Sequence, residues 1–179
     1  MFEEEWPMLI PNPVVLISSI DKDGRPNVMT CSWCGVCCTS PPLVQISIRP
    51  YNYTNKCLKE TMEMVVAVPP DKLIDKVLIC GSASGKYVDK VSLCQFELKE
   101  SELVKPYCIT QCIINMECKI VDVRNLGSHD MFIGHVLKVH HLLDTINHKV
   151  NEFREDLPLV YCTGNRSFYK LGEKLSRRH

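Results

Sequence analysis

Residues 27–56 read NVMTCSWCGVCCTSPPLVQISIRPYNYTNK and combine a strand, a loop of small residues, two prolines, a second strand and the start of a helix. Small and hydroxyl side chains let a ligand approach the backbone closely and supply short donors and acceptors. In this stretch they are Thr30, Ser32, Gly35, Thr39 and Ser40. The pattern predicts a cradle for a flat, phosphorylated cofactor.

The second half of the same stretch predicts a binding site for the phosphate of that cofactor. The strand LVQISIR ends at Arg49, and Thr54 is placed to cap a short helix over residues 55–60. Free amides and the positive end of a helix attract a phosphate, and nearby cations add charge-assisted bonds. Arg49 and Lys56 are therefore predicted to lie beside the phosphate.

A metal site is the alternative interpretation of the same residues. Cys31, Cys34 and Cys37 repeat the C-x2-C-x2-C spacing of an iron–sulfur ferredoxin, but Pro41 stands where the fourth cysteine is needed. In a continuous strand over residues 26–34, Cys31 and Cys34 would point to opposite faces. We therefore predict no metal at these cysteines.

Composition bounds the class of protein. The chain has 179 residues, 45% hydrophobic and 23% charged, which predicts one globular domain over residues 1–179. Lys plus Arg equals Asp plus Glu at 21 each, so no strong field favours nucleic acid or an anionic membrane as a partner.

Cysteine use and the N-terminal segment predict a cytoplasmic protein. MFEEEWP is acidic where a signal peptide is basic, and no apolar run reaches the ~18 residues of a membrane helix. The eleven cysteines are odd in number and scattered, unlike a secreted disulfide framework. They are expected to be reduced thiols, mostly in the core.

Outside the central stretch, the pattern is mainly β. PVVLISSI (13–20), the turn signal Asp21–Gly24 and a strand from Pro26 predict a hairpin, and EMVVAV (63–68) predicts another strand. Asp71 is expected to cap a helix that buries Leu73, Ile74, Val77 and Leu78 on one face.

The last third predicts a long hairpin. Ile114, Met116, Cys118 and Ile120 alternate with polar residues, which predicts a strand with one wet face, and MFIGHVLKV is its partner. Gly134 inside that partner predicts a bulge or a close backbone approach. Residues 144–156 are expected to form an exposed loop before a final strand, PLVYC (158–162).

One nucleotide-site motif and one hydrolase motif are imitated but not matched. GSASGK (81–86) has three residues between its glycines where a Walker loop needs four, and Tyr87 follows the lysine. Ser84 is one position late for the G-x-S-x-G elbow of hydrolases, and no G-x-G pair supports a Rossmann site.

Several runs, taken together, resemble a known family. PVVLISSIDKDGRPNVMTCSW, PPLVQISIRP, YT, GSASGKYVDK, GSHDMFIGHV and PLVYCTGNRSFYKLG follow one another over nearly the whole chain. Their order is far more specific than any one motif alone. The chain resembles the flavin reductase and flavoredoxin family of FMN-binding split-barrel proteins.

The resemblance implies a mainly β fold, a six-stranded antiparallel Greek-key split barrel with a few covering helices, assembled as a homodimer. FMN would carry the chemistry, so no catalytic side chain is assigned. The implied cofactor-binding residues are Met29, Thr30, Cys31, Ser32, Trp33, Ser47, Ile48, Arg49, Thr54, Lys56, Ser84, Gly85 and Lys86.

Two functions stay open under this fold, together with a third from another class. One is an enzyme that passes hydride from NAD(P)H through FMN, and the other is an electron carrier that exchanges electrons with a redox partner protein. The third is a cysteine-rich metal-binding module, which the argument from strand alternation disfavours.

The aromatic residues and histidines each have a structural alternative. Trp33 is predicted either to flank the flavin ring or to pack in the core or an interface. His129 lies in GSHD where the family shows Gly-Asp-His, so Ser128 replaces the acid and weakens an inherited role for this histidine. His140 and His141 are expected to be solvated surface groups, since no third metal ligand is visible in the sequence.

Overall fold

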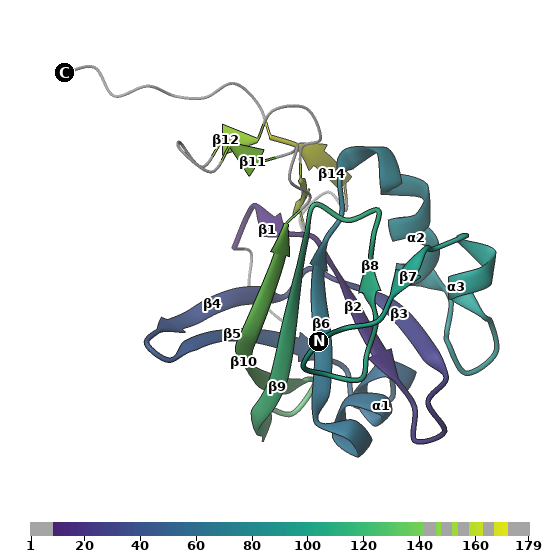
Figure 1. Ribbon diagram of the computed structural model, residues 1–179, viewed down its shortest axis with the longest axis vertical. Coiled ribbons are helices and arrows are strands. Elements are labelled where there is room, and N and C mark those ends of the chain that lie inside the picture. Colours follow the sequence, from purple (N-terminus) through teal and green to yellow (C-terminus); the bar gives the residue numbers. More distant parts are fainter. Residues whose placement is uncertain (1–8, 142–145, 148–151, 154–157, 163–166, 172–179) are drawn as a thin grey trace, which may run out of the picture.

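Seven strands form the main sheet of the computed structural model, which describes residues 9–141, 146–147, 152–153, 158–162 and 167–171. They are β2 (Val15–Ile20), β3 (Pro26–Cys31), β4 (Cys34–Thr39), β5 (Pro42–Ile48), β6 (Glu63–Val68), β9 (Ile114–Asn125) and β10 (Asp130–His141). Their order is β3-β2-β6-β9-β10-β5-β4, with every neighbouring pair antiparallel (Figure 1). The predicted mainly β, antiparallel fold is confirmed.

The connection between β3 and β4 explains why this sheet is a barrel. The two strands lie at opposite ends of the sheet order, yet only Ser32 and Trp33 separate them along the chain. Three Cα steps span at most about 11 Å. The sheet must therefore curl until its ends approach each other. The single strand predicted over residues 26–34 is wrong, because the chain leaves one end of the sheet at Cys31 and enters the other at Cys34.

Smaller sheets complete the described β structure. β1 (Asn12–Pro13), β13 (Leu159–Cys162) and β14 (Ser167–Lys170) form one, and β7 (Leu98–Lys99) pairs with β8 (Cys108–Ile109). β11 (Ile146–Asn147) pairs with β12 (Glu152–Phe153), so the region predicted as a plain loop over residues 144–156 contains a short strand pair. Its other residues lie outside the described part of the chain.

The helices are short and differ in detail from the predictions. α1 covers Tyr53–Thr61 with Asn52 at its N-cap, so Thr54 lies buried in the first turn and is not the cap. Asp71 begins a single 3-10 turn, η1 (Asp71–Leu73), before α2 (Ile74–Ser82), and α3 covers Lys90–Leu93. Leu78 is exposed because α2 buries Val77 and Cys80 instead.

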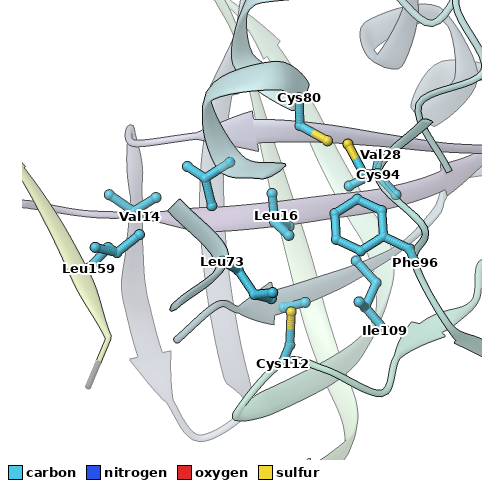
Figure 2. Packing of buried hydrophobic residues seen from close by; sticks show 12 residues of the cluster. Val14, Leu16, Val28, Leu73, Cys80, Cys94, Phe96, Ile109, Cys112 and Leu159 are labelled. Atoms are coloured by element: carbon cyan, nitrogen blue, oxygen red, sulfur yellow. The ribbon is translucent and has the colours of Figure 1, made fainter. Parts of the chain in front are cut away.

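Two apolar cores lie on the two faces of β2, whose residues are all buried. Val15 and Ile17 face the barrel interior with Ile46 and Phe132, whereas Leu16 packs under α2 in the second core. Figure 2 shows that second core, in which the sulfurs of its cysteines lie among carbon side chains. Ten cysteines have described side chains; all ten are free and seven of them are buried, as predicted for thiols mostly in the core.

The hairpin of β9 and β10 confirms one prediction and corrects another. The register shifts between Ile133 and Gly134, and a Cβ on Gly134 would lie 2.5 Å from Met64 Cε, so both the bulge and the close approach are present. The predicted wet face of β9 is present at Lys119, which is exposed, and is wrong at two other positions. Asn115 and Glu117 are buried, because residues 100–109 cross over that face and bond to both side chains.

Candidate flavin site

A cavity of about 250 Å³ lies where the two ends of the sheet meet. We call it the Trp33 cavity. The end of β3, the Ser32–Trp33 connection and the end of β5 form most of its wall. It is lined by Met29, Thr30, Cys31, Ser32, Trp33, Ser47, Ile48, Arg49, Asn52, His129 and Tyr161. Eight of these residues are predicted site residues.

Trp33 provides a flat wall supported by a second ring. The ring centroids of Trp33 and His129 are 4.5 Å apart and the planes are inclined by 33°. His129 comes from the turn between β9 and β10, and Ser128 Oγ lies 2.9 Å from its Nδ1. Partial burial and the positive charge of Arg49 lower the pKa of His129, so the imidazole is largely neutral at pH 7.

The floor of the Trp33 cavity is held by main-chain and thiol contacts. Ser47 N donates to Trp33 O at 2.9 Å, and Cys31 Sγ lies 3.5 Å from the same oxygen. Burial raises the pKa of the Cys31 thiol to about 11, so it stays protonated at neutral pH. Cys31 therefore offers a neutral, polarisable surface rather than a nucleophile.

A second cavity of about 230 Å³ adjoins the first and shares Met29 and Asn52 with it. We call it the Lys90 cavity. Its wall is formed by the start of α1 and by the chain from the end of α2 to α3. It is lined by Met29, Tyr51, Asn52, Tyr53, Thr54, Cys80, Gly81, Ser82, Ala83, Ser84, Gly85 and Lys90. Each cavity alone is below the usual ~300 Å³ of a ligand site, and the two together fall in that range.

Lys90 is the unusual group of the second cavity. The residue is only 4% exposed, and the polar contact found for its ammonium is Cys80 O at 3.4 Å. Within the described residues no carboxylate lies in ion-pair distance of it. Burial lowers the pKa of Lys90, which is the effect of a cation held away from water without a counter-charge. An anion in this cavity would relieve that cost.

The segment that faces Lys90 is held against β3 and α1 by a network of bonds. Arg25 donates to Gly85 O at 3.3 Å and to the hydroxyl of Tyr53 at 2.8 Å, and Tyr53 donates to Asp21 at 2.8 Å. A Cβ on Gly85 would lie 2.0 Å from Asn27 Oδ1, so only glycine fits here. That Asn27 oxygen is buried without a partner among the described atoms.

The predicted residues divide between the two cavities, with two exceptions. Thr54, Ser84 and Gly85 line the Lys90 cavity, where Thr54 Oγ1 accepts a bond from Asn27 Nδ2 at 2.9 Å. Lys56 and Lys86 line neither cavity. Lys56 is exposed and lies 3.7 Å from Glu60 one turn along α1, because the helix begins two residues earlier than predicted. Lys86 is exposed, with its ammonium 5.2 Å from the centroid of the Tyr87 ring.

Ten lining residues were not among the predicted site residues. They are Tyr51, Asn52, Tyr53, Cys80, Gly81, Ser82, Ala83, Lys90, His129 and Tyr161. Lys90 lies in the run GSASGKYVDK, directly after Asp89, whose side chain caps α3 by accepting from Val91 N and Ser92 N. An Asp followed by a Lys at the start of a helix was the sequence signal that could have identified Lys90. Tyr161 and Asn52 reach the site only through the tertiary fold.

The three cysteines Cys31, Cys34 and Cys37 do not form a metal-ligand group. Cys31 lies in β3 and the other two in β4, and Cys37 is exposed. In the described part of the chain, one group of ligand atoms is close enough for a metal, and it lies elsewhere, at Cys108, Glu117 and His140. No described helix is long and apolar enough to cross a membrane.

Comparisons with known proteins identify the family of this chain. Residues 8–170 match the family model described as flavin reductase like domain. An uncharacterized protein of Archaeoglobus fulgidus is 36% identical over 127 residues, which are 71% of this chain and 70% of that protein. One of Pyrococcus abyssi is 31% identical over 134 residues, 75% of this chain and 76% of that protein.

Solved structures with the same fold share little sequence with this chain. Flavoredoxin of Desulfovibrio vulgaris (Miyazaki F) superimposes with a TM-score of 0.90 at 23% identity, covering 99% of this chain and 96% of that one. An FMN-binding protein from Thermus thermophilus with bound 1-cyclohex-2-enone gives a TM-score of 0.85 at 21% identity, covering 99% of both chains. These similarities show the split-barrel fold.

Proposed function

Because the chain belongs to the flavin reductase-like family, we propose that it is an FMN-binding oxidoreductase, with the isoalloxazine ring in the Trp33 cavity and the phosphate in the Lys90 cavity. The observation that carries this proposal is the pairing of two adjoining cavities. One has a flat aromatic wall, and the other contains a buried ammonium without a described counter-charge. FMN has a matching planar end and anionic end.

The residues present fit this cofactor. In the Trp33 cavity, Trp33 and His129 offer ring faces, and residues 29–33 offer main-chain groups to the edge of a flat ligand. In the Lys90 cavity, Thr54, Ser82 and Ser84 offer short hydroxyl donors beside the cation. When bound, a flavin supplies hydride or electron transfer at its own ring. The protein supplies binding, orientation and partial exclusion of water.

Arg49 has a different position from the one expected for a phosphate ligand. Its guanidinium donates to the Tyr51 hydroxyl at 2.9 Å, and the residue is exposed on the wall of the Trp33 cavity. Tyr51 borders the Lys90 cavity, so Arg49 and Tyr51 together connect the two. We assign the main charge contact of the phosphate to Lys90 and a weaker, solvent-screened contact to Arg49.

The electron donor separates the two functions that share this site. We propose NAD(P)H as the donor, which makes the protein a flavin reductase. A redox partner protein is the donor or acceptor if the protein is an electron carrier like flavoredoxin. Anaerobic mixing of the FMN-loaded protein with NADH or NADPH distinguishes them. Rapid bleaching supports the enzyme, whereas bleaching by dithionite alone supports the carrier.

The many free thiols suit a reducing compartment such as the cytoplasm.

Flavin binding itself is the first prediction. Titration with FMN is expected to give a saturable complex of one flavin per chain, with the two visible flavin bands and quenched fluorescence, because Trp33 lies against the ring. Dithionite should bleach both bands. Trp33→Leu is expected to retain binding but lose most of the quenching. No flavin band after desalting from excess FMN, together with unchanged fluorescence during titration, would refute the proposed function.

A homodimer is the second prediction. β4 is an edge strand that pairs only with β5 in the described sheet, and its Val36 is 76% exposed on a hairpin that projects from the barrel (Figure 1). Exposed strand edges favour pairing with another chain, and in a symmetric dimer each copy covers the other. Light scattering is expected to give twice the mass of 20.5 kDa. Val36→Lys should shift the distribution toward monomers, whereas Val121→Lys, also at an exposed strand position, should not.

A further inference from the structure

A second group of reactive side chains lies outside both proposed flavin cavities. Cys108, Glu117 and His140 each offer one ligand atom, and these three atoms all lie within 4.8 Å of one another. They come from three strands, β8, β9 and β10. His140 is ten residues beyond Asp130 along β10, which corresponds to a separation on the order of 30 Å from the turn that carries His129. Cys108, Glu117 and His140 line neither the Trp33 cavity nor the Lys90 cavity, so the group is separate from the proposed flavin site.

Glu117 is the centre of this group and is fully buried. Its Oε1 accepts from Glu102 N at 2.8 Å, and its Oε2 accepts from Leu103 N at 2.6 Å. His140 Nε2 lies 2.6 Å from Oε1, which is a hydrogen-bond contact through one proton. A carboxylate with two main-chain donors keeps its orientation, as carboxylate ligands of metals usually do.

The third ligand, Cys108, comes from residues 100–109, the segment that crosses over β9. Cys108 is 5% exposed, and its sulfur lies 3.5 Å from Ser101 Oγ. Beside the three ligands is a cavity of about 140 Å³, bordered by Cys108, His140 and His141. This cavity leaves room for a fourth ligand such as water.

We propose that Cys108, Glu117 and His140 bind a divalent transition metal of the zinc class. Sulfur, imidazole and carboxylate ligands together suit Zn²⁺. Mg²⁺ and Ca²⁺ prefer sites made of oxygen ligands alone, so this group of ligands does not suit them. In a tetrahedral zinc site, ligand atoms are separated by roughly 3.3–3.6 Å, given bonds of about 2.0–2.3 Å. The three ligand atoms lie within 4.8 Å of one another, and His140 Nε2 is 2.6 Å from Glu117 Oε1. The metal replaces the proton shared by Glu117 and His140, and side-chain rotations that move these two atoms apart by about 0.7 Å admit it.

The consequence of metal binding is structural. Residues 100–109 cover the face of β9 that the sequence predicts to be wet, and Glu117 already bonds to two amides of this segment. A metal bound by Cys108, Glu117 and His140 would attach the same segment to β9 and β10 through coordinate bonds. Because the ligands are assembled only in the folded chain, binding stabilises the native state.

The experiment uses the FMN-loaded full chain, incubated with zinc chloride and then desalted. Mass spectrometry of the metal is expected to show about one zinc per chain, and X-ray absorption should show one sulfur at about 2.3 Å with nitrogen and oxygen at about 2.0–2.2 Å. Cys108→Ser and His140→Gln should each lower retained zinc at least tenfold. The matched controls Cys112→Ser, in the same cavity, and His135→Gln, on the same strand, should retain it.

Flavin absorbance and circular dichroism check that each variant is folded, and they do not depend on zinc. A chelator should lower the melting temperature of the parent by several degrees and leave that of His140→Gln unchanged. Less than a tenth of a zinc per chain in the parent overturns the proposal. Zinc that survives Cys108→Ser but is lost in Cys34→Ser also overturns it, because the metal is then bound by the cysteines of β4.

Discussion

Lys90→Met is expected to weaken FMN binding by about thirty- to a hundredfold while riboflavin binding changes by less than about twofold. The reason is that a charge-assisted contact between a desolvated ammonium and a phosphate contributes roughly 2–3 kcal/mol, and each 1.4 kcal/mol is tenfold in affinity. Riboflavin lacks the phosphate and keeps the Trp33 cavity, which does not include Lys90.

The same substitution has an opposite expected effect on stability. Lys90 is buried, and its one polar contact among the described residues is a long bond to Cys80 O, so in that part of the chain no charge compensates the cation of the flavin-free protein. Methionine has a similar length and no charge. The flavin-free Lys90→Met protein should therefore unfold at the same or a higher denaturant concentration than the parent. This combination of lost affinity and kept stability separates a ligand contact from a structural one.

Fluorescence titrations with FMN and riboflavin at one ionic strength test this prediction. Lys86→Met and Lys56→Met are matched controls, since both lysines are exposed and line neither cavity. Neither substitution should change the affinity for FMN by more than about twofold. Arg49→Ala should be intermediate. Equal FMN affinity in the parent and Lys90→Met would show that the phosphate is bound elsewhere, and a loss confined to Arg49→Ala would assign it to the Trp33 cavity.

Asp130→Ala is expected to lower the free energy of unfolding by roughly 3 kcal/mol at pH 7, because hydrogen bonds to a buried charged group contribute ~1.5–3 kcal/mol each and are not additive. Asp130 is 1% exposed and accepts from Lys59 Nζ at 2.6 Å, Asn55 Nδ2 at 2.9 Å and Asn125 Nδ2 at 2.8 Å. It ties α1 to the hairpin of β9 and β10. Alanine leaves the buried Asn55 amide without this acceptor.

The pH dependence of this effect has a definite sign. The bonds from Lys59, Asn55 and Asn125 lower the pKa of Asp130 from 3.8 to about 2, despite its burial. The carboxylate thus stabilises the fold fully above pH 4 and loses this contribution, about 2 kcal/mol, as pH falls toward 2. The free energies of unfolding of the parent and of Asp130→Ala, measured with urea, should therefore become more similar as the pH falls from 4 toward 2. A difference that stays constant from pH 6 to pH 2.5 would contradict the assignment, and Asp75→Ala, exposed on α2, serves as the control.

Local patterns in the sequence determined most of the strands and most of the lining of the Trp33 cavity. Alternation and turn residues place β2, β3, β5, β6 and the β9–β10 hairpin within a few residues, because each depends on contacts between sequence neighbours. The predicted residues Met29 to Trp33 and Ser47 to Arg49 line one cavity, at the ends of β3 and β5. Gly134 is likewise a local signal, and its bulge is present.

Only the tertiary structure decided which polar groups are buried and what faces them. Glu117 looks like a solvated residue on an alternating strand, and it is buried because residues 100–109 cross over it. Lys86 and Lys90 are indistinguishable by composition, yet the turn directs one to solvent and the other into a cavity shared with α1 and α2. A lysine, a histidine or a cysteine acquires its chemistry from solvation and from partners distant in the chain, and neither is encoded by local periodicity.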